Sequence, residues 1–572
     1  MTRLYNDPTS FTDEMVDGFV AAHGRWVRRV PGGVARATQV HPGTVAVVTG
    51  GGSGHYPAFG GLVGQGLAHG AALGNVFSSP SAQQIYSVAR AVERGAGVLL
   101  TYGNYTGDVL QFGLAQGRLL SDGIHCQMVT VTDDISSAAP HEPERRRGIA
   151  GDLAVFKAAG AAADAGYSLD EVVRVAANAN ARTRSFGVAF TGCTLPGANE
   201  PLFSVPQGRM GVGMGIHGEP GIGETDVPTA DQLAELFVAK LLEEVPPVAR
   251  QGGQIAVILN GLGAVKYEEL FVVYRRVDQL LRGAGLEIVE PEVGELVTSF
   301  DMAGASLTLC WLDEELERFW RAPVDTPAYR KGAVQTSTPV EFATIADPVE
   351  AAIPAASAES QSVAVTVRAA LAAIHQTIDA HADRLGKIDA VAGDGDHGIG
   401  MQRGATAALA AASNAVDQGA GAGTALSRAA DAWADRAGGT SGALWGVILR
   451  SIADHVGDDE VPSSAHLSAG VGAAAHRVMD LGGARVGDKT LVDVLVPFSL
   501  SLQEAVDGGS DLTTAWGIAS ERAQIAAKRT ADLVPRMGRA RSHTGKSVGT
   551  PDAGAVSLAL ITKTVHDVLI AR

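Results

Sequence analysis

The sequence predicts a chain of two parts, an α/β region followed by an all-helical region. Over roughly the first 330 residues, short continuous apolar runs bounded by glycine or polar residues alternate with segments of helical length. After residue 361 the apolar residues follow helical spacing instead. Residues 331–361 between them are rich in Thr, Ser, Ala, Pro and Glu, as in an extended linker. We therefore expect an α/β domain over 1–330, a linker over 331–361 and a helical domain over 362–572.

Four apolar runs in the first region indicate buried strands, at 45–49, 98–102, 128–131 and 255–259. The segment from Ser81 to Glu93 between two of them has helical length. Alternation of strand and helix favours a mostly parallel sheet. Because 330 residues is long for one sheet, we expect two α/β subdomains, divided near Gly192 to Pro196.

In the second region, Val367, Leu371, Ile374 and Ile378 repeat at the spacing of one helix face. Further alanine-rich helical segments are expected at 405–415, 423–436, 465–479 and 515–529. Functional residues of such a domain are expected in the connections between helices.

Bulk properties exclude some classes of function. A net charge of −17 over 572 residues argues against a nucleic-acid or anionic-membrane partner. The three cysteines are far apart in the sequence, so we expect reduced thiols and a cytoplasmic protein. The N-terminus has no apolar signal core. The sequence also contains no run of 18 apolar residues, so we expect no membrane span.

Three carboxylates lie within eight residues in the second region: Asp389, Asp394 and Asp396, with glycines among them. Carboxylates packed so closely repel one another unless a cation lies between them. Oxygen ligands suit Mg²⁺ or Ca²⁺, and the spacing does not match a Ca²⁺-binding EF-hand loop. A Mg²⁺ site that also holds nucleotide phosphates is the favoured interpretation, and an acidic turn between two helices is the alternative.

Two polar segments follow consecutive predicted strands of the first region. Residues 49–55 read Thr-Gly-Gly-Gly-Ser-Gly-His, so backbone N–H groups can approach a ligand closely. The alternative for this segment is a tight connection between a strand and a helix. Residues 104–108 read Asn-Tyr-Thr-Gly-Asp. Both should leave the same sheet edge, where Asp108 and His55 can meet as general base and partner. A helix N-cap is the alternative for Asp108.

His217 lies within a glycine-dense segment at 211–221 that does not predict a packed helix. Its imidazole can serve as a ligand, a base or a nucleophile toward a carbonyl. The alternative is a loop histidine that caps a backbone carbonyl. In the helical region, the turns at 438–443, 487–490 and 552–554 offer hydroxyls and backbone donors to phosphate, or form plain helix connections.

Taken together these motifs resemble the single-chain, ATP-dependent dihydroxyacetone kinases. Gly-Gly-Gly-Ser-Gly-His, Asn-Tyr-Thr-Gly-Asp, Cys-Thr-Leu-Pro-Gly at 193–197 and Gly-Ile-His-Gly-Glu-Pro-Gly at 215–221 resemble the substrate-binding (K) domain. The aspartate motif with His-Gly at 397–398, Gly-Thr-Ser-Gly-Ala at 439–443 and Gly-Asp-Lys-Thr at 487–490 resemble the nucleotide-binding (L) domain. The match covers nearly the whole chain in family order.

The resemblance implies a role for each residue of the K domain. His217 would hold the ketone carbonyl as a reversible hemiaminal, which selects short ketoses over polyols. Asp108 would accept the proton of the attacking hydroxyl, with His55 beside it. The substrate hydroxyls would be contacted by Gly52, Ser53, Gly54 and His55.

The resemblance also implies the nucleotide chemistry. Asp389, Asp394 and Asp396 would hold two Mg²⁺ that bridge the phosphates of ATP, for in-line phosphoryl transfer. The nucleotide site would be lined by His397, Gly398, Thr440, Ser441, Asp552, Ala553 and Gly554. An eight-helix barrel is implied for the L domain. A homodimer is also implied, in which the L domain of one chain caps the K domain of the other.

Departures from the family pattern bear on the substrate. Gly103 stands where relatives usually have Lys, and Asp152 where Thr is usual. In the L domain, Ala553 replaces the Pro of Asp-Pro-Gly and residues 541–547 differ from the usual segment. We expect either dihydroxyacetone or a larger ketose such as four-carbon erythrulose. The alternatives are a lyase that splits FAD into cyclic FMN on the same scaffold and a non-catalytic ketose-binding regulator.

Overall fold

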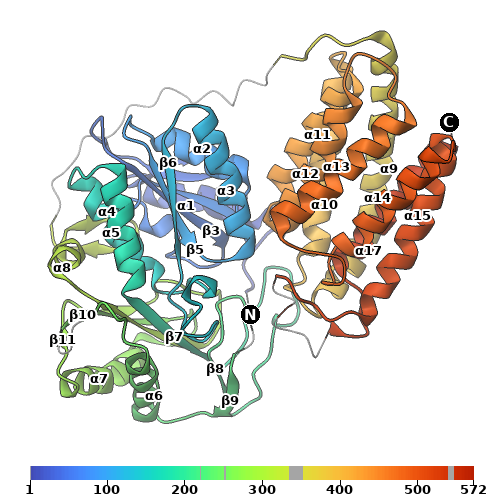
Figure 1. Ribbon diagram of the computed structural model, residues 1–572. Coiled ribbons are helices and arrows are strands. Elements are labelled where there is room, and N and C mark those ends of the chain that lie inside the picture. The colour runs from blue at the N-terminus through green and yellow to red at the C-terminus, as the bar shows by residue number, and fades with distance from the viewer. Residues whose placement is uncertain are drawn as a thin grey trace. The chain divides into compact units, whose positions relative to one another are not determined.

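The computed structural model describes residues 2–219, 221–249, 253–333, 352–538, 541 and 547–571 (Figure 1). The chain divides into two compact units, residues 1–347 and 348–572, each described here by itself. Of the expected linker at 331–361, residues 334–351 lie outside the described part of the chain. The first helix of the second unit begins at Ala358.

The first unit contains a six-stranded sheet with the order β1-β2-β4-β3-β5-β6. Its strands are β1 (Val27–Val30), β2 (Gly33–Arg36), β3 (Ala46–Ser53), β4 (Gly70–Val76), β5 (Val98–Gly103) and β6 (Cys126–Val131). Strands β4, β3, β5 and β6 run parallel to one another. Strand β2 is antiparallel to both β4 and β1, so β1 and β2 form an antiparallel edge. The parallel part agrees with the sequence prediction.

Helices cover both faces of this sheet, which explains the continuous apolar runs of its central strands. They are α1 (Phe11–His23), α2 (Ala82–Val92), α3 (Thr106–Ser121), α4 (Asp152–Asp164) and α5 (Leu169–Ala181). Ala46 and Val48 of β3 pack with α2 and α3, and Val47 between them packs with α4 and α5. Ser81 and Gln84 form a capping box that starts α2.

A second, seven-stranded sheet completes the first unit. Its strands are β7 (Thr183–Ala189), β8 (Arg209–Val212), β9 (Gly223–Asp226), β10 (Gln254–Gly261), β11 (Glu287–Ile288), β12 (Glu292–Gly294) and β13 (Gly304–Trp311). Helices α6 (Ala230–Glu243) and α7 (Tyr267–Gly283) lie together against one face (Figure 1). The unit ends with α8 (Glu314–Arg321) and the hairpin of β14 (Val324–Asp325) and β15 (Arg330–Lys331).

The second sheet corrects two expectations. It is mostly antiparallel, since successive strands in the order β10-β13-β7-β8-β9 run antiparallel, and only β11 and β12 pair parallel with β10. The division between the subdomains lies before Thr183, where β7 begins, and not near Gly192 to Pro196. Helices α4 and α5, which precede it, still pack on the first sheet.

The second unit is all-helical in its described residues. Its helices are α9 (Ala358–Asp389), α10 (His397–Asp417), α11 (Ala422–Ala437), α12 (Gly439–Val456), α13 (Ser464–Gly482), α14 (Val492–Asp507), α15 (Leu512–Arg529) and α17 (Ala553–Ile570). From α9 to α15 each helix packs against the next one in the chain, and α17 packs against α15 and α9, which closes a ring. The ring encloses an apolar cavity of about 310 Å³.

Helix α17 is long and apolar enough to cross a membrane by length and composition, and it is the one such helix in the described ranges. Half of it is buried inside the helical unit, where Leu558 and Ile561 are core residues. Its packing against α9 and α15 accounts for its apolar composition as a core helix.

Candidate active site

The parallel pairing of β3 and β5 brings two of the expected residues to one sheet edge. His55 follows the end of β3 at Ser53, and Asp108 lies in the first turn of α3, directly after β5. Ligands of open α/β sheets bind at the carboxyl ends of strands. Both side chains are withdrawn from bulk solvent, with exposed fractions of 1% for His55 and 8% for Asp108.

The glycine-rich segment is shaped by two aromatic side chains. A Cβ at Gly54, whose φ is +110°, would lie 2.6 Å from the Phe300 ring and 2.7 Å from the Phe77 ring. A Cβ at Gly52 would lie 2.7 Å from the backbone of Phe77. The hydroxyl of Ser53 donates a hydrogen bond to the Gly74 carbonyl at 2.7 Å, so it is already used within the sheet.

The two histidines face each other across this segment. Nε2 of His55 lies 2.9 Å from Nε2 of His217, and their rings are nearly perpendicular. Phe77 stacks on His55 with a centroid separation of 4.9 Å, and Tyr105 meets His217 edge-on at 4.7 Å. Aromatic surface therefore surrounds a contact between two imidazoles.

The partners on the far sides of the rings determine where protons lie. Nδ1 of His55 donates to the Thr298 carbonyl at 2.7 Å, because a carbonyl oxygen only accepts. Nδ1 of His217 faces Oε1 of Glu219 at 3.0 Å and donates to it. The short contact between the Nε2 atoms needs one further proton, since two lone pairs would repel. The histidine pair thus carries one positive charge in this arrangement, opposite the carboxylate of Glu219.

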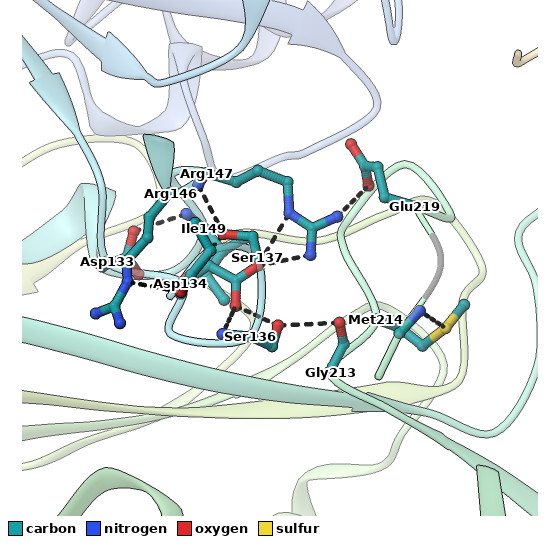
Figure 2. Close-up of polar contacts among 12 residues, drawn as sticks. Asp133, Asp134, Ser136, Ser137, Arg146, Arg147, Ile149, Gly213, Met214 and Glu219 are labelled. Carbon is teal, nitrogen blue, oxygen red and sulfur yellow. Dashed lines mark hydrogen bonds and ion pairs between the residues drawn. The ribbon is translucent and has the colours of Figure 1, made fainter. Parts of the chain in front are cut away.

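Glu219 belongs to a buried chain of alternating charges (Figure 2). Its Oε2 lies 3.9 Å from Nη1 of Arg147, whose Nη2 and Nε lie 2.8 Å and 3.0 Å from Oδ2 of the fully buried Asp134. Burial by itself would lower the pKa of Arg147, but Asp134 and Glu219 outweigh it and raise that pKa above its usual value. Arg147 therefore stays charged and fixes Glu219 behind His217.

The aspartates of the helical unit converge as the sequence predicts. Asp389 is the last residue of α9, and Asp396 is the N-cap of α10. One carboxylate oxygen from each of Asp389, Asp394 and Asp396 lies within 4.8 Å of the others. Oδ2 of Asp389 also accepts the backbone N–H of Gly395 at 2.9 Å, which closes the turn. Three converging carboxylates are the donor set that Mg²⁺ prefers.

His397, the first residue of α10, forms hydrogen bonds to the beginnings of two other helices beside this turn. Its Nε2 lies 3.0 Å from the Ser557 hydroxyl of α17, and its Nδ1 lies 3.2 Å from the Ser441 hydroxyl of α12. Burial lowers its pKa to about 4, so the ring is neutral at physiological pH. Gly398 has a packing role, because a Cβ there would collide with the Ala382 carbonyl of α9.

A second acidic group lies beside the aspartates. Asp552 caps α17 by accepting the Ala555 N–H at 2.7 Å. Burial raises its pKa to about 7, and the charges of Asp389 and Asp493 add to this. Ala553 and Gly554 form the first turn of α17.

Thr440 lies in the first turn of α12, next to the tight bend at Gly438, whose φ is +61°. Both helix N-termini are suited to anions.

Several residues of these sites had no signal in the sequence reasoning. Phe77 and Phe300 have φ values of 52° and 49°, which are unusual for bulky residues. Arg147 and Asp134 form their ion pair between loops, and Ser557 is a plain helix residue. Glu219 and Arg147 each lie within a motif of the family pattern, and the position of Glu219 two residues after His217 was an available signal.

Comparison with known proteins places these features in one family. A family model described as the Dak1 domain matches residues 17–328, and one described as the DAK2 domain matches residues 391–567. The chain is similar to the L-erythrulose kinase of Pectobacterium atrosepticum, with 60% identity over 100% of this chain and 97% of the relative. It is also similar to the D-erythrulose kinase of Mycolicibacterium smegmatis, with 54% identity over 99% of this chain and 98% of the relative.

A solved structure supports the same assignment. The crystal structure of the dihydroxyacetone kinase from C. freundii in complex with AMP-PNP and Mg²⁺ is 30% identical, with a TM-score of 0.53 and 99% of each chain covered. The resemblance inferred from the motifs is thus confirmed over the whole length. The chain belongs to the dihydroxyacetone kinase family, with a Dak1 and a DAK2 domain fused in one polypeptide.

Proposed function

We propose that this chain is an ATP-dependent kinase that phosphorylates a terminal hydroxyl of erythrulose, a four-carbon ketose held covalently on His217. The observation that carries the proposal is the buried pair of His55 and His217, with Glu219 fixed behind the nucleophile. The names of the two erythrulose kinase relatives support the substrate. The reaction class is transfer of a phosphoryl group to an alcohol.

Binding of the ketose begins at Nε2 of His217. The histidines separate, His55 keeps the proton that lay between them, and the lone pair of Nε2 adds to the carbonyl carbon. The carbonyl electrons move to oxygen, which takes the proton held on Nε2 of His55 and becomes a hydroxyl. The new N–C bond leaves positive charge on the His217 ring, and Glu219 stabilises that charge or accepts the Nδ1 proton. A polyol has no carbonyl and cannot be held in this way.

Transfer then requires a base for the attacking hydroxyl. We assign this role to Asp108, with His55 beside it, because both follow neighbouring strands at one sheet edge. Backbone groups of Gly52, Ser53 and Gly54 contact the substrate hydroxyls, since the Ser53 side chain is engaged with Gly74. After the adduct has formed, Nδ1 of His55 still donates to Thr298, and its Nε2 accepts a hydrogen bond from the new hydroxyl.

The helical unit supplies the phosphoryl donor. Asp389, Asp394 and Asp396 would hold two Mg²⁺, and bound Mg²⁺ would neutralise the phosphates of ATP during transfer. Thr440, Ser441 and the 552–554 turn contribute hydroxyls and helix N-termini to the nucleotide. His397 and Gly398 hold the surrounding helices in place.

The substrate proposal is tested by a coupled ATP-consumption assay with dihydroxyacetone, D-erythrulose, L-erythrulose and glycerol. We expect one erythrulose enantiomer to have the highest kcat/KM and glycerol to give no turnover. A clear preference for dihydroxyacetone would reject erythrulose as the substrate. Addition of ¹³C-labelled ketose should give a tetrahedral C2 signal with wild type and none with His217→Ala. FAD cleavage retained in His217→Ala would instead favour the lyase.

We also propose that the active form is a cytoplasmic homodimer in which one chain's nucleotide domain serves the other chain's ketose. This is tested by mixing His217→Ala and Asp394→Asn chains, each inactive alone, after subunit exchange. Catalysis across chains predicts recovery of about a quarter of wild-type activity, because half of the dimers are mixed and each has one intact pair. Catalysis within one chain predicts no recovery.

A further inference from the structure

Gly103, at the end of β5, lies directly against the backbone of Gly148. A Cβ at Gly148 would be 2.5 Å from the Gly103 Cα, so only glycine fits there. A Cβ at Gly103 would be 3.3 Å from both the Gly148 carbonyl oxygen and Cε2 of Tyr105. A side chain at Gly103 would therefore crowd the Tyr105 ring, which also contacts His217.

The carboxyl group of Asp152 borders the same place. Its Oδ1 lies 3.0 Å from the position that a Cβ at Gly148 would take, and the Cα of Gly103 lies 2.5 Å from the same position. The side chain comes from the first turn of α4 and the residue is only 2% exposed. No hydrogen-bond partner for this Oδ1 is found among the described residues.

A buried carboxyl oxygen without a partner is costly, and a structural explanation fails here. An acidic residue in the first turn of a helix commonly accepts backbone N–H groups. Here these groups are accepted by Asp133, from the loop after β6, whose Oδ1 and Oδ2 accept the N–H groups of Ile149 and Gly151 at 2.9 Å and 2.8 Å. Asp133 therefore already accepts the backbone N–H groups of that turn, and Oδ1 of Asp152 accepts none of them.

The charge environment makes Asp152 a donor as well as an acceptor. Burial raises its pKa well above the usual value, and the charges of Asp133 and Asp108 raise it further. A raised pKa favours the protonated form of this carboxyl group, which is the form that donates hydrogen bonds in apolar sites. The influence of Asp108 also shows that Asp152 is close to the residue we assign as base.

We propose that Asp152 is a specificity-determining residue whose carboxyl group hydrogen-bonds the hydroxymethyl group that a four-carbon ketose has and dihydroxyacetone lacks. The added carbon lies beside Gly103, where this chain carries no side chain, and beside the Tyr105 ring. This inference rests on the proposed function, because it concerns the substrate held on His217. It explains why this site contains a buried carboxyl oxygen without a hydrogen-bond partner among the described residues.

The test compares kcat/KM for the preferred erythrulose and for dihydroxyacetone in wild type, Asp152→Asn and Asp152→Leu. Loss of one hydrogen bond to a buried substrate hydroxyl should lower the erythrulose value of Asp152→Leu about 10-fold to 100-fold. The dihydroxyacetone value should stay within about 3-fold, because that substrate does not reach Asp152. Asp152→Asn keeps a donor and an acceptor and should retain most of the preference.

Thermal unfolding separates this role from a structural one. Asp152→Leu should melt at or above the wild-type temperature, because it removes an unsatisfied buried acid. Asp133→Asn is the matched control: it should lower the melting temperature and change both kcat/KM values by the same factor. Equal losses for both substrates in Asp152→Leu would overturn the inference alone. Wild type that phosphorylates dihydroxyacetone and neither erythrulose would reject the proposed function together with it.

Discussion

His55 and His217 approach each other at 2.9 Å through their Nε2 atoms, although 162 residues separate them in the chain. Each ring is fixed at its other nitrogen, by the Thr298 carbonyl and by Glu219 respectively. The contact engages the lone pair of His217 before the ketose binds and positions His55 for the step that follows. Substrate binding must replace this hydrogen bond by a covalent bond, so the groups behind the two rings control the reaction.

Glu219→Gln should weaken the covalent adduct. The amide oxygen can still accept the Nδ1 proton of His217, but the negative charge opposite the ring is lost. We expect kcat/KM for the ketose to fall about 10-fold to 100-fold, the usual effect of losing a charge-assisted hydrogen bond. The adduct, measured from the tetrahedral C2 signal of ¹³C-labelled ketose, should fall in parallel. An unchanged adduct population would show that Glu219 does not act through His217.

Asp394→Asn should separate the two halves of the reaction. The substitution removes one charge from the three converging carboxylates, so bound Mg²⁺ and its nucleotide should be lost. We expect kcat to fall at least about 100-fold, while the ¹³C signal of the ketose adduct stays at wild-type intensity. Asp417→Asn, at the exposed end of α10 where Asp417 pairs with Arg368, is the matched control for loss of one carboxylate. Loss of the adduct in Asp394→Asn would contradict separate roles.

Lys157→Met should change how stability depends on pH. The Lys157 ammonium is fully buried and donates to the Phe319 carbonyl at 2.6 Å. Burial, with a smaller contribution from the charge of Lys331, lowers its pKa to about 7, against 10.5 for an unperturbed lysine. Between these values the unfolded chain binds a proton that the native protein does not bind. The free energy of unfolding should therefore rise with pH across this window, by at most about 1.4 kcal/mol per unit from this group.

Chemical denaturation at several pH values between 7 and 10 measures this effect. In Lys157→Met the rise contributed by this group should vanish, and the variant should be at least as stable as wild type near pH 7, where the buried amine is most costly. Lys240→Met, an exposed position paired with Glu243, should leave the slope unchanged. Equal slopes for wild type and Lys157→Met would contradict the assignment.

The parts of the structure that the sequence predicted are those with a local cause. Strands β3 and β5 are buried on both faces and read as continuous apolar runs, and α9 carries its apolar face at regular spacing. The second sheet was misjudged because short strands such as β8 and β9 carry little apolar signal. The ion pair of Arg147 with Asp134, the left-handed conformation of Phe77 and the serine partners of His397 depend on tertiary contacts. No local pattern encodes such contacts.

Gly103→Lys should shift the preference of the enzyme from erythrulose toward dihydroxyacetone. The φ of Gly103 is outside the left-handed region, and a Cβ would meet Gly148 and Tyr105 at 3.3 Å, so a side chain fits after a shift of a few tenths of an ångström. A lysine side chain would occupy the region beside Tyr105 and exclude the added hydroxymethyl group. We therefore expect kcat/KM for erythrulose to fall about 10-fold or more and kcat/KM for dihydroxyacetone to be maintained. Gly103→Ala adds only the Cβ and should leave the ratio between the two substrates near that of wild type, which separates backbone displacement from loss of space. An unchanged ratio in a folded Gly103→Lys enzyme would mean that the fourth carbon of the ketose lies elsewhere, since the substitution acts on no other described part of the substrate site.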